Sequence, residues 1–186
     1  MARTIGLIAV VSSAVYFLSD VVEVVQGRFS TWQLWLTLIA EATVPVFVIG
    51  FALTRGHRPL GWVGDLSAIV YAYAFLYFTG TVMYALSNGT RDYEVLTHQL
   101  GLIMTAHGAA MVIAGVGFGC SVIHARLFPT WTAVALMVGV VFVALAQGLP
   151  GGVQLLAAGV RDVGFAGMGI AQMRSATSST VTRTSH

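Results

Sequence analysis

The chain has 186 residues, of which 57% are hydrophobic and only 9% are charged. Soluble domains carry about 25% charged residues, because water must wet their surface. A chain this poor in charge cannot cover a water-facing surface, so most of its exterior must face lipid. The composition excludes a soluble globular protein and predicts an all-α bundle embedded in a bilayer.

Six apolar stretches are each long enough to cross a bilayer, which takes about 20 residues at about 1.5 Å per residue. They cover residues 5–25, 32–54, 62–86, 97–124, 131–149 and 151–173. The sequence therefore predicts one six-helix transmembrane domain over residues 1–173, followed by a disordered Ser/Thr-rich tail over 174–186. For the sixth stretch, which contains Arg161 and Asp162, a re-entrant or interfacial segment is the alternative.

The basic residues are nine arginines that occur singly, with no lysine. Nucleic-acid binding needs a basic run or patch, so nucleic acid is excluded as a partner. Outside the spans, the arginines divide unequally between the two sides of the predicted bundle. One side carries Arg28 and Arg91, and the other carries Arg3, Arg55, Arg58, Arg126, Arg174 and Arg183. The positive-inside rule predicts cytoplasmic termini for a multi-pass protein of the cell membrane.

Ionisable side chains inside a membrane are costly and usually face the bundle interior or a wet cavity. Asp20, Glu41, His107, Arg161 and Asp162 all lie within predicted spans. At about 1.5 Å per residue, Asp20 lies about 8 Å from the outer end of its span, and Glu41, His107 and Arg161 lie about 14–15 Å in. This agreement predicts one polar cluster or cavity that opens toward the outside.

Helical periodicity adds aromatic side chains to this cluster. Tyr16 shares a face of the first span with Asp20, and Tyr73 and Tyr77 share a face of the third. The predicted catalytic residues are Glu41, Asp162 and Asp20. The predicted substrate-binding residues are Tyr16, Tyr73, Tyr77, His107 and Arg161.

A membrane enzyme is one function that these residues suit. A buried carboxyl such as Glu41 or Asp162 can donate a proton, and aromatic faces can stabilise a developing cation. This chemistry fits cyclisation or isomerisation of a lipophilic, isoprenoid-like or lipid-like substrate, and the sequence indicates no cofactor. In residue type and depth alone, the carboxylates are similar to those of membrane-bound terpene cyclases and sterol isomerases.

Other interpretations stay open on the sequence. A small transporter, a proton-coupled carrier or a binding subunit of a membrane complex would also use an outward polar cavity. A structural role would pair Glu41 with Arg161 and leave His107 and the tyrosines to packing. A metal site of Glu41, His107 and Asp162 is the weakest alternative, because the chain contains no metal-binding motif.

Two spans carry patterns that predict their place in the bundle. Gly101, Gly108 and Gly115 recur every seven residues in span 97–124, which is typical of close helix packing, so this helix is predicted to be central. Span 131–149 is nearly free of polar groups and is predicted to face lipid or a second copy of the chain. Cys120 is the one cysteine, which excludes an intrachain disulfide.

Overall fold

The computed structural model describes residues 1–54 and 59–183, with backbone alone for 177–183. Six α-helices and no strands make up this part of the chain. The helices are α1 (Ala2–Gln26), α2 (Thr31–Leu53), α3 (Gly61–Asn88), α4 (Tyr93–His124), α5 (Thr130–Leu145) and α6 (Gly151–Arg183). Arg55 and Arg58 lie outside the described residues. The predicted all-α fold is confirmed.

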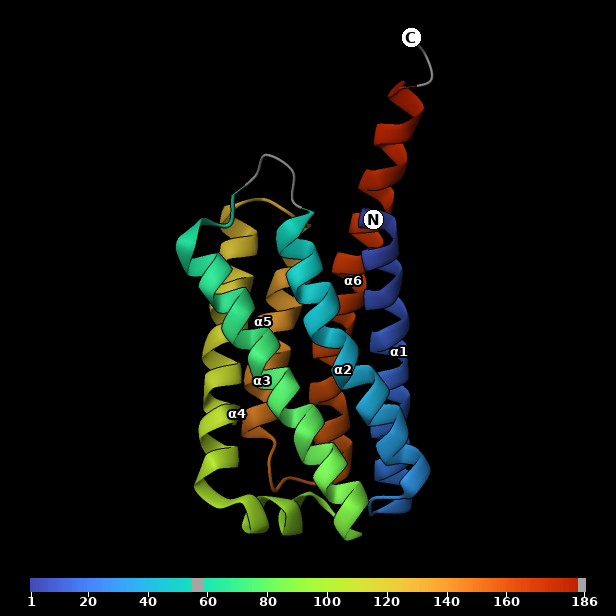
Figure 1. Cartoon of the computed structure of the whole chain (residues 1–186), viewed down its shortest axis with the longest axis vertical. Helices are drawn as coiled ribbons and strands as arrows, with labels where there is room; N and C mark the ends of the chain where they lie inside the picture. The colour runs from blue at the N-terminus through green and yellow to red at the C-terminus, as the bar shows by residue number, and fades with distance from the viewer. Residues whose placement is uncertain (55–58, 184–186) are drawn as a thin grey trace.

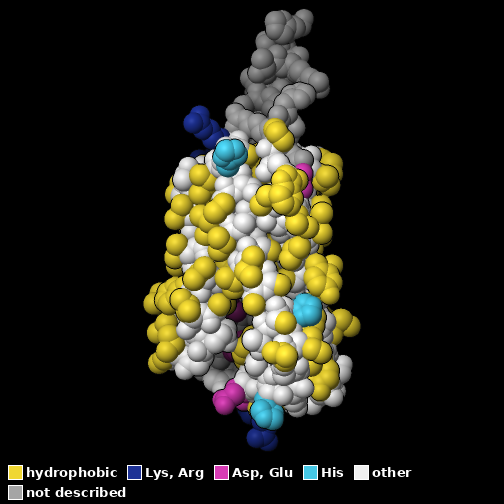
Figure 2. Space-filling view, turned by 90° about the vertical axis from the view of Figure 1, so that its left-hand side faces the viewer, with side chains coloured by type: hydrophobic (Ala, Val, Ile, Leu, Met, Phe, Trp, Pro, Cys, Tyr) yellow, Lys and Arg dark blue, Asp and Glu magenta, His cyan; other side chains and the backbone are white. Residues whose placement is uncertain are grey.

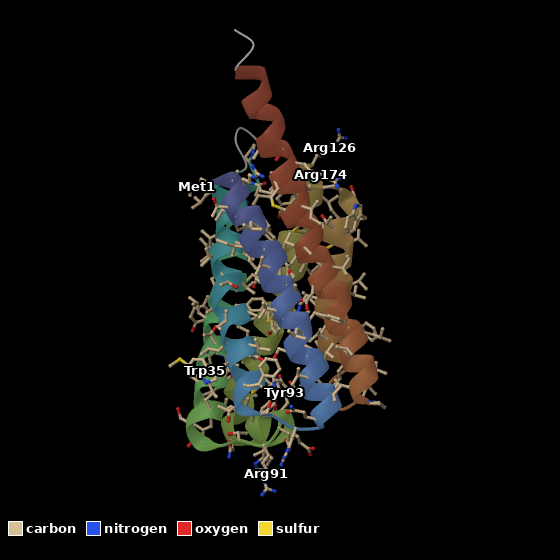
Figure 3. All side chains as sticks on the ribbon, turned by 90° about the vertical axis from the view of Figure 1, so that its right-hand side faces the viewer. Met1, Trp35, Arg91, Tyr93, Arg126 and Arg174 are labelled. Carbon is tan, nitrogen blue, oxygen red and sulfur yellow. The ribbon has the colours of Figure 1, made fainter. Side chains whose placement is uncertain are left out.

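The helices run alternately up and down, so the two termini lie at the same end of the bundle (Figure 1). We call this the terminal end, where Met1, Arg126 and Arg174 lie, and the opposite one the far end, where Arg91 lies (Figure 3). Each helix packs against the next along the chain, and α6 closes the ring against α1. Polar groups on the inner faces of distant segments can therefore meet at the centre.

Five helices (α1 to α4, and α6) are long and apolar enough to span a membrane. In lipid every backbone polar group must be bonded within the protein, which explains the continuous helices. Hydrophobic side chains cover the visible face along its length, and charged ones gather near the two ends (Figure 2). The chain is therefore a multi-pass membrane protein.

α5 is shorter than the predicted span 131–149. It has 16 residues and ends at Leu145, because the chain turns through Gly148, whose φ of 78° is favourable only for glycine, before Pro150. Its inner face is buried between α4 and α6, with Leu136 and Val140 almost inaccessible. α6, by contrast, continues past the predicted end of its span at residue 173 and projects beyond the bundle (Figure 1).

α4 differs most from its predicted form. It begins at Tyr93 instead of residue 97, after an N-cap in which Asp92 accepts a hydrogen bond from the Val95 N–H. At Gly101 the backbone leaves helical geometry (φ 58°, ψ −139°), so the first two turns lie across the far end of the bundle (Figure 1). The predicted central position is wrong: in its most apolar stretch 17% of residues are buried, against 39–50% in the other four long helices.

Aromatic side chains fill the terminal half of the ring. The Phe47 ring lies 5.7 Å from that of Phe51 and 5.0 Å, edge-on, from that of Phe165. Phe51 continues the contact to Phe128 at 5.0 Å. All four are buried, and we call them, with Phe75, whose ring lies 6.5 Å from that of Phe165, the aromatic layer. Such a layer leaves little room for a polar path toward the terminal end.

Candidate functional site

Hydrogen bonds made by polar side chains join α1 to α2. The Ser12 hydroxyl donates to the Ala40 carbonyl (3.1 Å), and the Ser19 hydroxyl donates to the Gln33 carbonyl (3.1 Å). The Gln33 side-chain amide in turn donates to the Glu23 carboxylate at 3.1 Å. These bonds fix the two helices against each other and engage Glu23 in the scaffold.

Glu41 is buried beside these hydrogen bonds, near the middle of α2. The Tyr16 hydroxyl donates to Glu41 Oε1 at 2.7 Å, whereas Oε2 has no hydrogen-bond partner among the described residues. The Glu41 carbonyl also lacks its usual hydrogen bond within the helix, because Pro45 has no N–H to donate to it. One carboxylate oxygen of Glu41 is thus held by α1, and the other is free to meet a proton or a ligand.

Arg161 enters the ring from α6 and faces α1. Its Nε donates to Asp162 Oδ1 at 2.9 Å, and its Nη2 lies 3.6 Å from Asp20 Oδ2. The guanidinium also lies over the Tyr16 ring, 4.1 Å from the centroid, as in a cation–π contact. Among the described residues the ion pairs of Arg161 are therefore with Asp162 and Asp20, while Glu41 bonds to Tyr16 instead.

The position of Arg161 depends on close packing between α5 and α6. A Cβ atom added at Gly139 would lie 2.3 Å from the Arg161 nitrogen and 2.4 Å from its Cα. Only glycine allows the two backbones to approach this closely. The two helices are therefore closely packed at the turn of α6 that carries Arg161 and Asp162.

Tyr71 is a member of this site that the sequence analysis missed. Its ring is fully buried, and its hydroxyl has no hydrogen-bond partner within the described part of the chain. It lies on the buried face of α3 with Phe75, away from the polar stripe of Tyr73 and Tyr77. In the structure it packs against α4, where a Cβ added at Gly115 would lie 3.0 Å from the Tyr71 ring, and the sequence alone carries no signal of this contact.

The charges of this group, which we call the buried cluster (Tyr16, Asp20, Glu41, Tyr71, Arg161 and Asp162), are unequal. Three carboxyl groups surround one guanidinium, so full ionisation would leave a net charge of −2 in apolar surroundings. Unpaired buried charges cost several kcal/mol each, about 3–5 in measured cases. Besides Glu41 Oε2 and the Tyr71 hydroxyl, three further atoms lack a hydrogen-bond partner among the described residues, namely Oδ2 of Asp20, Oδ2 of Asp162 and Nη2 of Arg161, although Arg161 Nη2 and Asp20 Oδ2 form the ion pair at 3.6 Å. The cluster therefore has capacity for protons or for a polar ligand group.

Access to the cluster is from the far half of the bundle. The Asp20 side chain is 21% exposed, against 5% for Arg161 and Asp162. A hollow opens in the face formed by α4, within the far half, and acidic side-chain atoms are visible at its base (Figure 2). On α4 itself, a Cβ added at Gly108 would meet nothing within 4 Å. A molecule dissolved in the bilayer could approach through this side.

Three of the predicted site residues lie outside the buried cluster. His107 stacks on Tyr77 with ring centroids 3.7 Å apart and an interplanar angle of 10°. Its Nε2 lies 3.5 Å from the hydroxyl of Tyr73, which is 58% exposed, and its Nδ1 lies 2.8 Å from the Ile103 carbonyl. The structure thus divides the predicted set into a buried cluster and a surface group of Tyr73, Tyr77 and His107.

Within the described residues, no three His, Cys, Asp or Glu side chains are arranged to hold a metal ion. In particular, His107 is not brought together with Glu41 and Asp162. Comparison with protein-family models, with curated proteins and with solved structures finds no match for the chain.

Proposed function

We propose that the buried cluster is an acid–base site for a lipophilic substrate, with Glu41 as the proton donor. The observation that carries this proposal is the carboxyl of Glu41, which is buried, held through one oxygen by Tyr16 and without a partner at the other. A purely structural carboxylate would be expected to have both oxygens satisfied. An oxygen without a protein partner can instead carry a proton for a reacting group that enters the site.

The surrounding residues support a neutral, proton-bearing Glu41. The single guanidinium is already engaged by Asp162 and Asp20. A further carboxylate charge in the same apolar space would have no cation of its own, and proton uptake is the usual way to avoid that cost. Asp20, the most exposed of the three carboxyls, then suits exchange of protons with the far side.

The remaining members have supporting roles in this proposal. Asp162 orients the guanidinium through the 2.9 Å hydrogen bond, and the guanidinium in turn covers the Tyr16 ring. Tyr16 positions Glu41. The Tyr71 hydroxyl, which has no hydrogen-bond partner among the described residues, and Arg161 Nη2, which lies 3.6 Å from Asp20 Oδ2, are donors that could stabilise a developing negative charge or hold a polar group of the substrate. The substrate class would be an isoprenoid or a similar lipid, in an isomerisation or cyclisation.

A proton-coupled carrier would use the same groups, but the aromatic layer favours the enzyme. Phe47 lies six residues beyond Glu41 toward the terminal end, about 9 Å at the helical rise, and Phe165 lies about 6 Å beyond Arg161. Their rings pack edge-on at 5.0 Å. A carrier must open a path through this layer, whereas an enzyme needs access from one side only.

We further propose that the terminal end faces the cytoplasm of a cell membrane. Arg3, Arg126 and Arg174 lie at or near this end, and Arg28 and Arg91 border the loops of the far end. Reporter fusions after Gly89 and after Met173 should then report opposite sides, the first outside and the second inside. Two fusions reporting the same side would contradict the bundle topology.

Proton donation to carbon can be tested without knowing the substrate. Proteoliposomes would be incubated with a lipid extract in D2O, and lipids would be analysed by mass spectrometry for carbon-bound deuterium. The wild-type protein should label one lipid species, and Glu41→Gln should abolish the labelling. Glu94→Gln, a matched change at an exposed site on α4, should retain it. Absence of protein-dependent labelling from wild-type samples, or full labelling by Glu41→Gln, would contradict the proposal.

A further inference from the structure

A second pocket lies at the far end, separate from the buried cluster. Its volume is about 720 Å³, within the range of small-molecule sites. It is bordered by the α1–α2 loop, the last turn of α3 and the residues that follow α3. Its lining residues are Gln26, Arg28, Phe29, Ser30, Thr31, Leu34, Ala85, Leu86, Gly89, Thr90 and Arg91.

Both arginines of the far-end loops border this pocket, and no acidic residue does. Neither arginine forms an ion pair with any described residue, whereas the nearby Asp92 is engaged as the N-cap of α4. The two loops are held together by a hydrogen bond from the Phe29 N–H to the Arg91 carbonyl at 2.7 Å. This hydrogen bond therefore fixes the two loops that carry the arginines relative to each other.

The rest of the lining is amphipathic. Phe29, Leu34 and Leu86 provide apolar surface, and Ser30, Thr31 and Thr90 provide hydroxyls and backbone groups. Thr31 also begins α2, and the first N–H groups of a helix favour an anion. Two guanidinium groups, hydroxyl donors and an apolar floor at the end of a transmembrane bundle match an anionic head attached to an apolar chain.

We propose that this pocket binds a phosphate group, supplied by the headgroup of an anionic lipid or by free phosphate. Arg28 and Arg91 contact the phosphate oxygens, and Leu34 and Leu86 contact the first part of the acyl chain when the source is a lipid. The proposal is independent of the acid–base chemistry of Glu41.

The test uses the full-length, delipidated protein in detergent and native mass spectrometry. Phosphatidylglycerol and phosphatidylcholine with identical acyl chains would be titrated against the wild type and against Arg28→Gln/Arg91→Gln. The wild type should prefer phosphatidylglycerol by about tenfold or more, and the double variant should lose this preference, because each arginine–phosphate contact is charge-assisted. Arg3→Gln removes an exposed charge near the terminal end and should leave the preference unchanged.

Competition with inorganic phosphate distinguishes the two sources. Displacement of phosphatidylglycerol by millimolar phosphate would assign the pocket to the free anion, and retention of the lipid would assign it to the headgroup. Equal binding of the two lipids by the wild type would overturn the proposal. An unchanged preference in a double variant with wild-type thermal stability would do the same.

Discussion

The two halves of the bundle are packed in different ways, and α4 shows the difference within one helix. Near the terminal end a Cβ added at Gly119 would lie 2.4 Å from Met137 Cγ, and one added at Gly115 would lie 3.0 Å from Tyr71. In the far half, Cβ atoms at Gly101 and Gly108 would meet nothing within 4 Å. Glycines of α4 therefore allow close packing toward the terminal end, whereas those in the far half border open space.

This contrast separates a scaffold from a site. The terminal half contains aromatic rings and glycine-mediated contacts, which need no polar partner. The buried cluster begins near the middle of the bundle, at Tyr71, Glu41 and Arg161, and extends toward the far half; its hydrogen-bonding atoms are only partly satisfied. Changes in the first region should act on stability, and some changes in the second should act on chemistry alone.

The largest expected effect is on stability, from Arg161→Met. It removes the cation that pairs with Asp20 and Asp162, so it should lower the free energy of unfolding by about 3–5 kcal/mol. Glu41→Gln should change it by less than about 1 kcal/mol, because the amide oxygen can still accept from Tyr16. Thermal unfolding in detergent measures both.

The double variant Glu41→Gln/Arg161→Met decides how these two residues are related. It should be as unstable as Arg161→Met alone, since Glu41 bonds to Tyr16 and the ion pairs of Arg161 are with the two aspartates. Recovery of stability in the double variant would instead show that Glu41 and Arg161 neutralise each other, which is the structural interpretation of the sequence.

A smaller effect is expected from alanine at two glycines. Gly139→Ala places a Cβ 2.3 Å from the Arg161 backbone, and overpacking of this kind costs about 1–3 kcal/mol. Gly108→Ala enters open space on a helix, where alanine is favoured over glycine by up to about 1 kcal/mol. The first variant should therefore melt earlier than the wild type, and the second should not. Equal destabilisation by both would show that an added Cβ costs as much at the open position as at the close contact, and would contradict this difference in packing.

The sequence was sufficient to predict the all-α membrane bundle, because hydropathy and length determine which segments can cross lipid. It also predicted that Asp20, Glu41 and Arg161 lie at similar depths, since depth follows from residue count along a helix. Depth does not determine which way a side chain points around the helix axis. The sequence therefore could not show that Tyr73 and His107 lie outside the buried cluster. Their assignment as site residues stays a prediction.

Backbone features explain the other differences between sequence and structure. α5 ends early because Gly148 turns the chain, and α4 breaks at Gly101 within a run that hydropathy alone reads as continuous helix. Tyr71 escaped notice because its one polar atom is carried on a face that otherwise packs as a core. A single hydroxyl on an apolar face becomes informative only when its neighbours across the ring are known.

The smallest expected effect concerns the surface group and His107→Phe. Phenylalanine keeps an aromatic ring against Tyr77 but loses the contacts of the two imidazole nitrogens with Tyr73 and the Ile103 carbonyl. Because these contacts lie at a partly exposed position, the free energy of unfolding should change by less than about 1 kcal/mol. Deuterium labelling of lipid should also stay at the wild-type level, since His107 contacts no member of the buried cluster in the described structure. Loss of labelling with unchanged thermal stability would place His107 in the reaction after all, and would extend the site across α3 and α4 as the sequence predicts.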